Sequence, residues 1–296
     1  MTNRQKLSAG FAIYVTVTIL LVVLVGSSGR NDAFQPQTEF KLDPWINLPG
    51  PFDINKAVLY VIVAAAITVW VMIYLARRMQ EHPNRVQTIV ETVYTVMRDN
   101  ITRNNMDASM AAKWFPFIAT LFLFIWISNL IGYIPLPTNT EHPVNIFGVD
   151  VPAFAIYAAT ANLSIPLALA IVVFIAYTVE GVRAKGPIGY LKGLVPGGVT
   201  GGLAVVLFGL ELFSNFMRLI SLSVRLFANI LAGHLIILFM AGGIAVLLGT
   251  AAVAWVTLPF GVILFIFEVG LVATLQAFIF ATLASIYFGG AVSHDH

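Results

Sequence analysis

The sequence predicts an all-α, polytopic membrane protein with about six spans, a cytoplasmic surface helix and two long tilted C-terminal helices. Of its 296 residues, 59% are hydrophobic and only 10% are charged, and the mean hydropathy is +0.89. Soluble domains do not have such a composition. The apolar residues gather in long runs, and a helix of about 20 apolar residues crosses a bilayer with its own backbone hydrogen bonds satisfied. Lys and Arg concentrate in alternate loops between these runs.

The runs divide the chain into four parts. Four runs are long enough to span a membrane, at residues 9–25, 57–75, 114–136 and 153–179, and a longer apolar region covers 201–291. The expected parts are an N-terminal span or signal-like segment (1–26), an outer loop (27–56), helical spans with a surface helix and an outer hairpin (57–200), and two long helices (201–296). The first run also fits a cleaved signal peptide, because basic residues precede it and small residues follow it.

Positive charges orient the spans. The region between the second and third runs carries Arg77, Arg78, Arg85, Arg98, Arg103 and Lys113, whereas residues 137–151 carry no Lys or Arg. Cytoplasmic loops are enriched in these residues, so both termini are expected in the cytoplasm unless the first span is removed. Between residues 85 and 103, apolar side chains recur on one helical face, which is typical of a helix lying on the membrane surface.

The stretch from residue 201 to 243 is too long for one upright span. As a straight helix it would measure about 60 Å, twice the hydrocarbon thickness. Two spans would need a turn near its middle, where residues 218–226 contain neither Pro nor Gly. We therefore expect one tilted helix, followed by a second that contains Pro259.

Three charged residues, Glu211, Arg218 and Arg225, recur every seven residues along this expected helix. That spacing puts them in one stripe. A charge at the bilayer centre is costly and usually faces protein or a water-filled cavity. Snorkelling or pairing with a neighbour is the favoured interpretation for Arg218. Arg225 lies deeper, and a functional role is favoured there, because arginine keeps its charge even when poorly solvated.

Two further ionisable residues lie deep in the last third of the chain. His234 lies about 180° round the helix from Arg225, and a proton relay and a packing role are equally compatible with it. Glu268 is harder to explain by packing, because a buried carboxylate without partners must be protonated or reach water. Proton pathways use such residues.

Two motifs resemble one known family. The run SLSVRLFANILAGH, residues 221–234, closely resembles the signature of subunit a of the rotary ATP synthase, and LQAFIFATLASIYF, residues 275–288, is similar to its final helix. The resemblance implies six proton-translocation residues: Arg225 as the essential arginine, Asn229 as its neighbour one turn on, Glu211 as a polar inlet residue, Gln276 as the glutamine facing the arginine, and His234 with Glu268 as a histidine–glutamate pair.

The resemblance also implies a function. The chain would be a non-catalytic, proton-translocating stator subunit whose two offset half-channels protonate and deprotonate carboxylates on the rotor. The implied partners are the rotor ring of c subunits, the peripheral-stalk b subunits, the rest of the ATP synthase complex and membrane lipid. The implied location is the bacterial inner membrane. The outer inlet would use Glu211, His234 and Glu268, while Asn229 and Gln276 would hold water. No cofactor or metal is expected, and no P-loop occurs.

Two features depart from the family pattern. Glu268 lies eight residues before Gln276, whereas family members usually have seven. One extra residue rotates a helix by about 100°, so a bulge or a different local path would be needed to bring Glu268 to the family's position. Asn162 and Ser164 stand where many relatives have Asp and Asn, which removes a carboxylate from the fourth span.

The main alternative is a haem- or quinone-linked membrane redox subunit. Haem within a membrane generally needs facing histidines, and His234 alone lies deep in an apolar run. The spans contain no motif of an intramembrane protease. A solute carrier should have inverted repeats, and none is visible in the sequence. A net charge of +2 and aromatic residues confined to apolar runs argue against nucleic-acid binding. The absence of cysteine excludes disulfides and thiolate metal sites.

Overall fold

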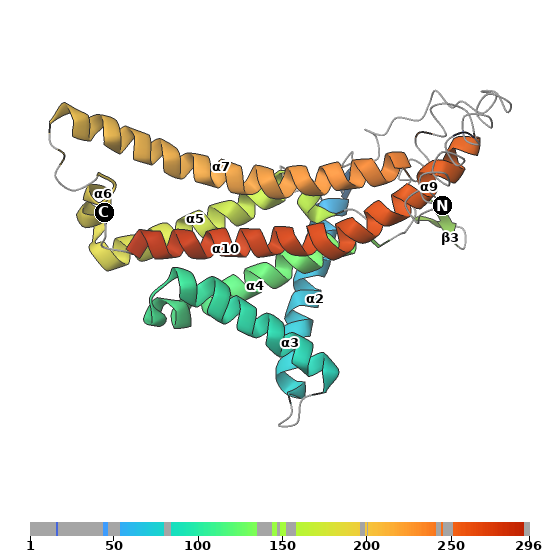
Figure 1. Ribbon diagram of the computed structural model, residues 1–296, viewed down its shortest axis with the longest axis horizontal. Helices are drawn as coiled ribbons and strands as arrows, with labels where there is room; N and C mark the ends of the chain where they lie inside the picture. The colour runs from blue at the N-terminus through green and yellow to red at the C-terminus, as the bar shows by residue number, and fades with distance from the viewer. Residues whose placement is uncertain are drawn as a thin grey trace, which may run out of the picture. The chain divides into compact units, whose positions relative to one another are not determined.

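The computed structural model (Figure 1) describes residues 16, 44–46, 54–79, 84–134, 144–146, 149–151, 158–195, 199, 201–240, 244 and 251–292. The expected first span, residues 9–25, and most of the expected outer loop, 27–56, lie outside this part of the chain. The larger of two compact units contains the described residues of Pro44–Leu136, Ile156–Ile230 and Val272–His296. The smaller unit contains those of Met1–Asp43, Pro137–Ala155 and Leu231–Leu271.

Five helices among the described residues are long and apolar enough to cross a membrane. They are α2 (Lys56–Arg78), α4 (Ala108–Gly132), α5 (Ser164–Lys185), α7 (Gly202–Leu238) and a C-terminal helix that combines α9 (Ala251–Phe267), η5 (Glu268–Val272) and α10 (Ala273–Val292). The predicted all-α polytopic fold is therefore confirmed. The remaining predicted span, residues 9–25, lies outside the described part of the chain except for residue 16.

The helix α7 is unbroken over 37 residues (Figure 1). The prediction of one long helix in place of two spans is confirmed. At 1.5 Å per residue it measures about 55 Å, well beyond a hydrocarbon core of about 30 Å, so it needs a strong tilt to remain in the bilayer. The second predicted helix also forms, with Pro259 inside α9.

The amphipathic segment predicted over residues 85–103 is helical, but it changes type part-way. It begins as the α-helix α3 (Arg85–Thr95), where the side chain of Asn84 accepts a hydrogen bond from the Gln87 amide at 2.8 Å. It continues as the π-helix η2 (Val96–Arg103). Val86 and Ile89 stay exposed on α3, as expected of a helix whose apolar face meets lipid.

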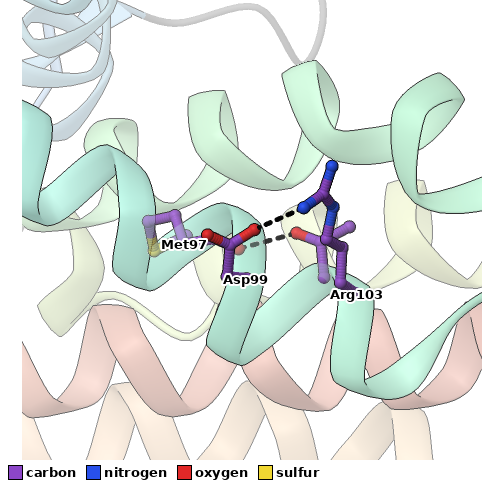
Figure 2. Close-up of polar contacts among 4 residues, drawn as sticks. Met97, Asp99 and Arg103 are labelled. Atoms are coloured by element: carbon purple, nitrogen blue, oxygen red, sulfur yellow. Dashed lines mark hydrogen bonds and ion pairs between the residues drawn. The ribbon is translucent and has the colours of Figure 1, made fainter. Parts of the chain in front are cut away.

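Side chains within η2 hold its wider turns (Figure 2). The Thr102 hydroxyl donates to the Met97 carbonyl, five residues earlier, at 2.8 Å. Arg103 and Asp99 form an ion pair at 3.0 Å on the exposed side. Met97, Ile101 and Thr102 are buried. The π-helix thus turns one face inward while its charges remain outside.

Shorter elements connect the spans. Two antiparallel ladders pair β1 (Pro44–Ile46) with β2 (Ile54–Asn55), and β3 (Val144–Ile146) with β4 (Val149–Val151). The predicted outer hairpin lies on this second ladder. A 3₁₀ turn, η3 (Ala159–Ala161), precedes α5, and the short helix α6 (Pro187–Lys192) follows it. At the start of α5, the side chain of Asn162 accepts a hydrogen bond from the Ser164 amide at 2.9 Å.

The core of the larger unit lies where α10 packs against α4 and α5. The packing face of α10 carries small buried residues, namely Ala273, Ala277, Ala281 and Ala284. Small residues let membrane helices approach closely. Near the end of α10, Gly289 lies so close to the residues just after η2 that an added Cβ would be 1.8 Å from the Asn105 carbonyl oxygen. Phe288 is also fully buried there, with its ring centroid 4.3 Å from that of Trp114.

A buried ion pair joins α4 to α5. The Lys113 ammonium donates to the carboxylate of Glu180, which is only 6% exposed. The lysine side chain is half exposed. The pair neutralises a carboxylate that would otherwise be buried without a counter-charge.

Candidate functional site

The charged stripe predicted on α7 forms a local network at its first two positions. Arg218 donates to Glu211 at 3.2 Å and to Asn215 at 3.3 Å. Both partners of the ion pair are about two-fifths exposed. The pairing favoured for Arg218 from the sequence is therefore present.

This network lies in a cavity of about 950 Å³ within the larger unit. Polar groups from four helices line the cavity together with Glu211 and Arg218: Tyr177 and Lys185 of α5, Tyr190 of α6, Ser214 and Asn215 of α7, and Tyr287 of α10. The guanidinium of Arg218 lies 5.8 Å from the centre of the Tyr287 ring. A cavity of this volume with polar groups on its wall is large enough to admit water beside the charged pair.

Arg225 lies further along α7 in a different setting. Arg225 and Asn229, one turn apart, are both exposed. Leu222, Leu226 and Ile230 are buried on the same stretch of helix. The helix therefore packs through its leucine and isoleucine face and leaves the arginine face uncovered by the described residues.

Gln276 occupies a buried position on α10. It is 6% exposed, and its neighbour Ala273 on the same face is fully buried. That Gln276 faces Arg225 stays a prediction. The immediate support of this part of α10 comes from α4, because the Trp126 indole donates to the Thr274 hydroxyl at 3.0 Å.

Glu268 meets α7 in the smaller unit. A Cβ built on Gly233 would lie 2.4 Å from Oε2 of Glu268. The carboxyl group thus occupies the space that any other side chain at position 233 would need. Since His234 is the next residue, the structure brings Glu268 to the turn of α7 that carries the predicted histidine partner.

The helix that carries Glu268 changes type at this residue. The π-helix η5 covers Glu268–Val272, between α9 and α10. The eight-residue spacing from Glu268 to Gln276 therefore includes one complete π segment. Whether this segment brings Glu268 to the position that the family pattern implies stays a prediction.

Of the six predicted residues, Glu211 lies in the cavity of the larger unit together with Arg218, Tyr287 and Lys185. His234 and Glu268 belong to the smaller unit. Sequence reasoning missed Tyr287 as a lining residue, although it lies within the recognised motif at residues 275–288. Among the described residues, no group of three or more His, Cys, Asp or Glu could hold a metal ion.

Comparison with known proteins agrees with the motifs. The family model described as ATP synthase A chain matches residues 58–289, most of the chain. This chain belongs to the ATP synthase A chain family. It is accordingly a multi-pass subunit of the membrane sector of ATP synthase.

Several curated relatives carry the name ATP synthase subunit a. The one from Parvibaculum lavamentivorans is 34% identical over 276 residues, which cover 91% of this chain and 97% of the relative. That from Bradyrhizobium diazoefficiens is 36% identical over 80% of this chain and 88% of its own length. That from Rubrobacter xylanophilus is 34% identical over 79% and 83%, respectively. The likeness to subunit a of ATP synthase therefore extends well beyond the two motifs.

Proposed function

We propose that this chain is the stator subunit that conducts protons past the rotor ring of c subunits and couples their flow to rotation. The observation that carries the proposal is the setting of Arg225. A guanidinium that cannot lose its charge lies within a membrane span, on a helix face that the described residues leave uncovered. Such a charge needs a partner, and an ionised carboxylate on the rotor ring is the partner that fits.

The fixed charge would control the order of proton transfers. Opposite Arg225, Coulomb attraction in a low-dielectric setting favours the ionised form of a rotor carboxylate. The same charge repels protons that would leak directly between the two half-channels. A proton then crosses only while it is bound to a rotor carboxylate that rotates from one half-channel to the other. A membrane potential supplies about 2.3 kcal/mol per charge for each 100 mV.

We assign the two half-channels to opposite ends of α7. His234 and Glu268, whose carboxyl group packs on Gly233, belong to the outer inlet. The cavity around Glu211 and Arg218 is lined by Lys185 and Tyr190. Their segment carries Arg183, Lys185 and Lys192, and such basic residues favour the cytoplasmic side. We therefore place Glu211 in the cytoplasmic half-channel and not in the inlet with His234. Asn229 and Gln276 would hold water near Arg225 by hydrogen bonds.

The proposed setting of the subunit follows from this role. It would be non-catalytic, would sit in a bacterial inner membrane, and would contact the c ring and the peripheral-stalk b subunits. The alternative is a haem- or quinone-linked redox subunit. Haem bands from this chain in the absorption spectrum of the purified complex would support that alternative.

Arg225→Ala and Arg225→Lys test the proposal. Both variants should abolish ATP synthesis driven by a membrane potential, because alanine has no charge and a poorly solvated lysine can release its proton. The measurement uses the whole complex in energised vesicles, with copurification of the ring as the check on assembly. Arg183→Ala, at an exposed basic residue of α5 outside the site, is the control and should retain synthesis. Normal coupled synthesis by the assembled alanine variant would refute the mechanism.

A further inference from the structure

The hydroxyl of Tyr177 on α5 is buried but has no hydrogen-bond partner among the described residues. The whole residue is only 4% exposed. An unpaired hydroxyl in a protein interior costs free energy, so buried groups of this kind almost always have a partner, either a protein group or an ordered water. The partner of Tyr177 must therefore come from the space that its hydroxyl faces.

This space is the cavity of about 950 Å³ that also contains the Glu211–Arg218 ion pair, within the larger unit. Tyr177 is the least exposed of the polar residues that line it. Its hydroxyl lies within electrostatic range of the Arg218 guanidinium and of the Tyr190 and Tyr287 hydroxyls. All three of these residues belong to the same cavity wall. The hydroxyl of Tyr177 therefore points into the cavity, on its most buried side.

Three aromatic rings fix the direction of the Tyr177 side chain. The ring centroid of Phe174 lies 5.3 Å from that of Tyr177, with the two rings edge to face. The centroids of Tyr287 and Phe288 lie at 5.8 Å and 6.5 Å. A ring held in this way cannot turn its hydroxyl towards another part of the protein without disrupting close packing. The hydroxyl thus keeps its place in the cavity wall through ring packing and not through a hydrogen bond.

Water is the partner that fits this position. A water takes up about 30 Å³ in the liquid and needs about two to four polar partners, and the cavity offers both the volume and the polar groups. A tyrosine hydroxyl can donate and accept a hydrogen bond, whereas an arginine can only donate.

We propose that the Tyr177 hydroxyl anchors ordered water on the buried side of this cavity. Tyr177 is then a positioning residue, which keeps that water in hydrogen-bond contact with the Glu211–Arg218 pair. Water-mediated hydrogen bonds of this kind are nearly as favourable as direct ones. The importance of Tyr177 for proton transfer rests on the proposed function of the cavity as a half-channel.

The first measurement detects the water and does not depend on the proposed function. Tyr133, directly after α4, is also 4% exposed but is not part of the cavity wall, so it is a matched reference within the same chain. Radiolysis of the intact solubilised complex generates hydroxyl radicals from water, and these label a buried tyrosine only where water lies beside it. Tyr177 should be labelled at least about five-fold faster than Tyr133. Equally slow labelling of the two tyrosines would overturn the proposal.

The second measurement uses Tyr177→Phe, which removes the hydroxyl and keeps the ring. The melting temperature of the solubilised complex should stay unchanged, because the three ring contacts remain. ATP synthesis driven by a membrane potential should fall at least about three-fold. The solvent isotope effect on synthesis in D₂O should rise, because proton transfer through the disrupted water becomes the slower step. Tyr94→Phe, at an exposed tyrosine of α3 outside the cavity, is the matched control and should change neither the rate nor the isotope effect.

Two results with the assembled Tyr177→Phe complex would overturn the positioning role. One is synthesis at the normal rate, and the other is slower synthesis with an unchanged isotope effect, which would indicate a structural role only. If the variant did not assemble, the labelling of Tyr177 relative to Tyr133 in the parent would decide whether water is held there. If Arg225→Ala remained coupled, the proposed function would fail, yet the labelling would still test the water site.

Discussion

At the scale of single residues, Gly233 contributes space in place of a functional group. Its missing side chain makes room for a carboxyl group that must approach α7 closely. Glycine is the default residue where a close approach is required. The polar residues of the predicted site were visible in the sequence, but this spatial requirement was not.

Gly233→Ala should displace the Glu268 carboxyl group, because the new methyl would lie 2.4 Å from its oxygen. We expect potential-driven ATP synthesis by the assembled complex to fall at least ten-fold. Gly209→Ala, on the same helix but with open space at its Cβ, should have little effect. A Gly233→Ala/Glu268→Asp double variant should recover part of the loss, since aspartate is shorter by one methylene. Full activity of Gly233→Ala would contradict the packing described here.

The ion pair of Lys113 with Glu180 lends itself to a stability measurement. Lys113→Ala leaves the buried carboxylate of Glu180 without its donor, at an expected cost of about 1–3 kcal/mol because the lysine is half exposed. Glu180→Gln keeps the shape and removes the charge, so it should cost less. Thermal inactivation of the detergent-solubilised complex compares the two variants. Equal stability of Lys113→Ala and the parent would show that water already solvates the carboxylate.

At the scale of elements, the closest approach at a glycine among the described residues joins the end of α10 to the residues just after η2. Gly289 faces the Asn105 carbonyl at a distance that excludes any Cβ, whereas the adjacent Gly290 has nothing within 4 Å of a Cβ. The Ser285 hydroxyl donates to the Ile101 carbonyl at 3.0 Å on the same interface. Two neighbouring glycines thus offer a matched pair.

Gly289→Ala should force α10 away from η2 and destabilise the protein by about 1–3 kcal/mol, as overpacking of a buried contact does. Gly290→Ala should be close to neutral. The amount of subunit retained in membranes, together with the melting temperature of the solubilised complex, separates the two. If both variants lost a similar amount of stability, the glycine pair would act through helix flexibility and not through the close contact.

The two π segments also belong to the scale of elements, and they mark the limit of what hydrophobic periodicity can reveal. Periodicity predicted helices over residues 85–103 and through Glu268, and helices are present there. It could not show that hydrogen bonds change from i→i+4 to i→i+5 within them, because a single π turn shifts the apolar pattern by only one residue. Only the spacing of Glu268 from Gln276 signalled that the backbone had to deviate.

At the scale of the whole molecule, the sequence predicted the spans well because each is a long apolar run with its own backbone satisfied. The single helix α7 followed from the lack of a turn signal near Arg218. The cavity was not predictable, since its lining comes from four helices far apart in the chain. The grouping of Glu211 with His234 stays a prediction, because the two residues belong to different compact units.

The length of α7 has a consequence for the surrounding lipid. A continuous rod of about 55 Å cannot match an apolar slab of about 30 Å while upright, and several of its large side chains are exposed, Val205 and Leu203 among them. Hydrophobic mismatch of this kind is relieved by leaning or by deforming the adjacent leaflets. The thickness of the bilayer therefore bears on the tilt of this helix, and through the tilt on the depths at which its charged groups lie.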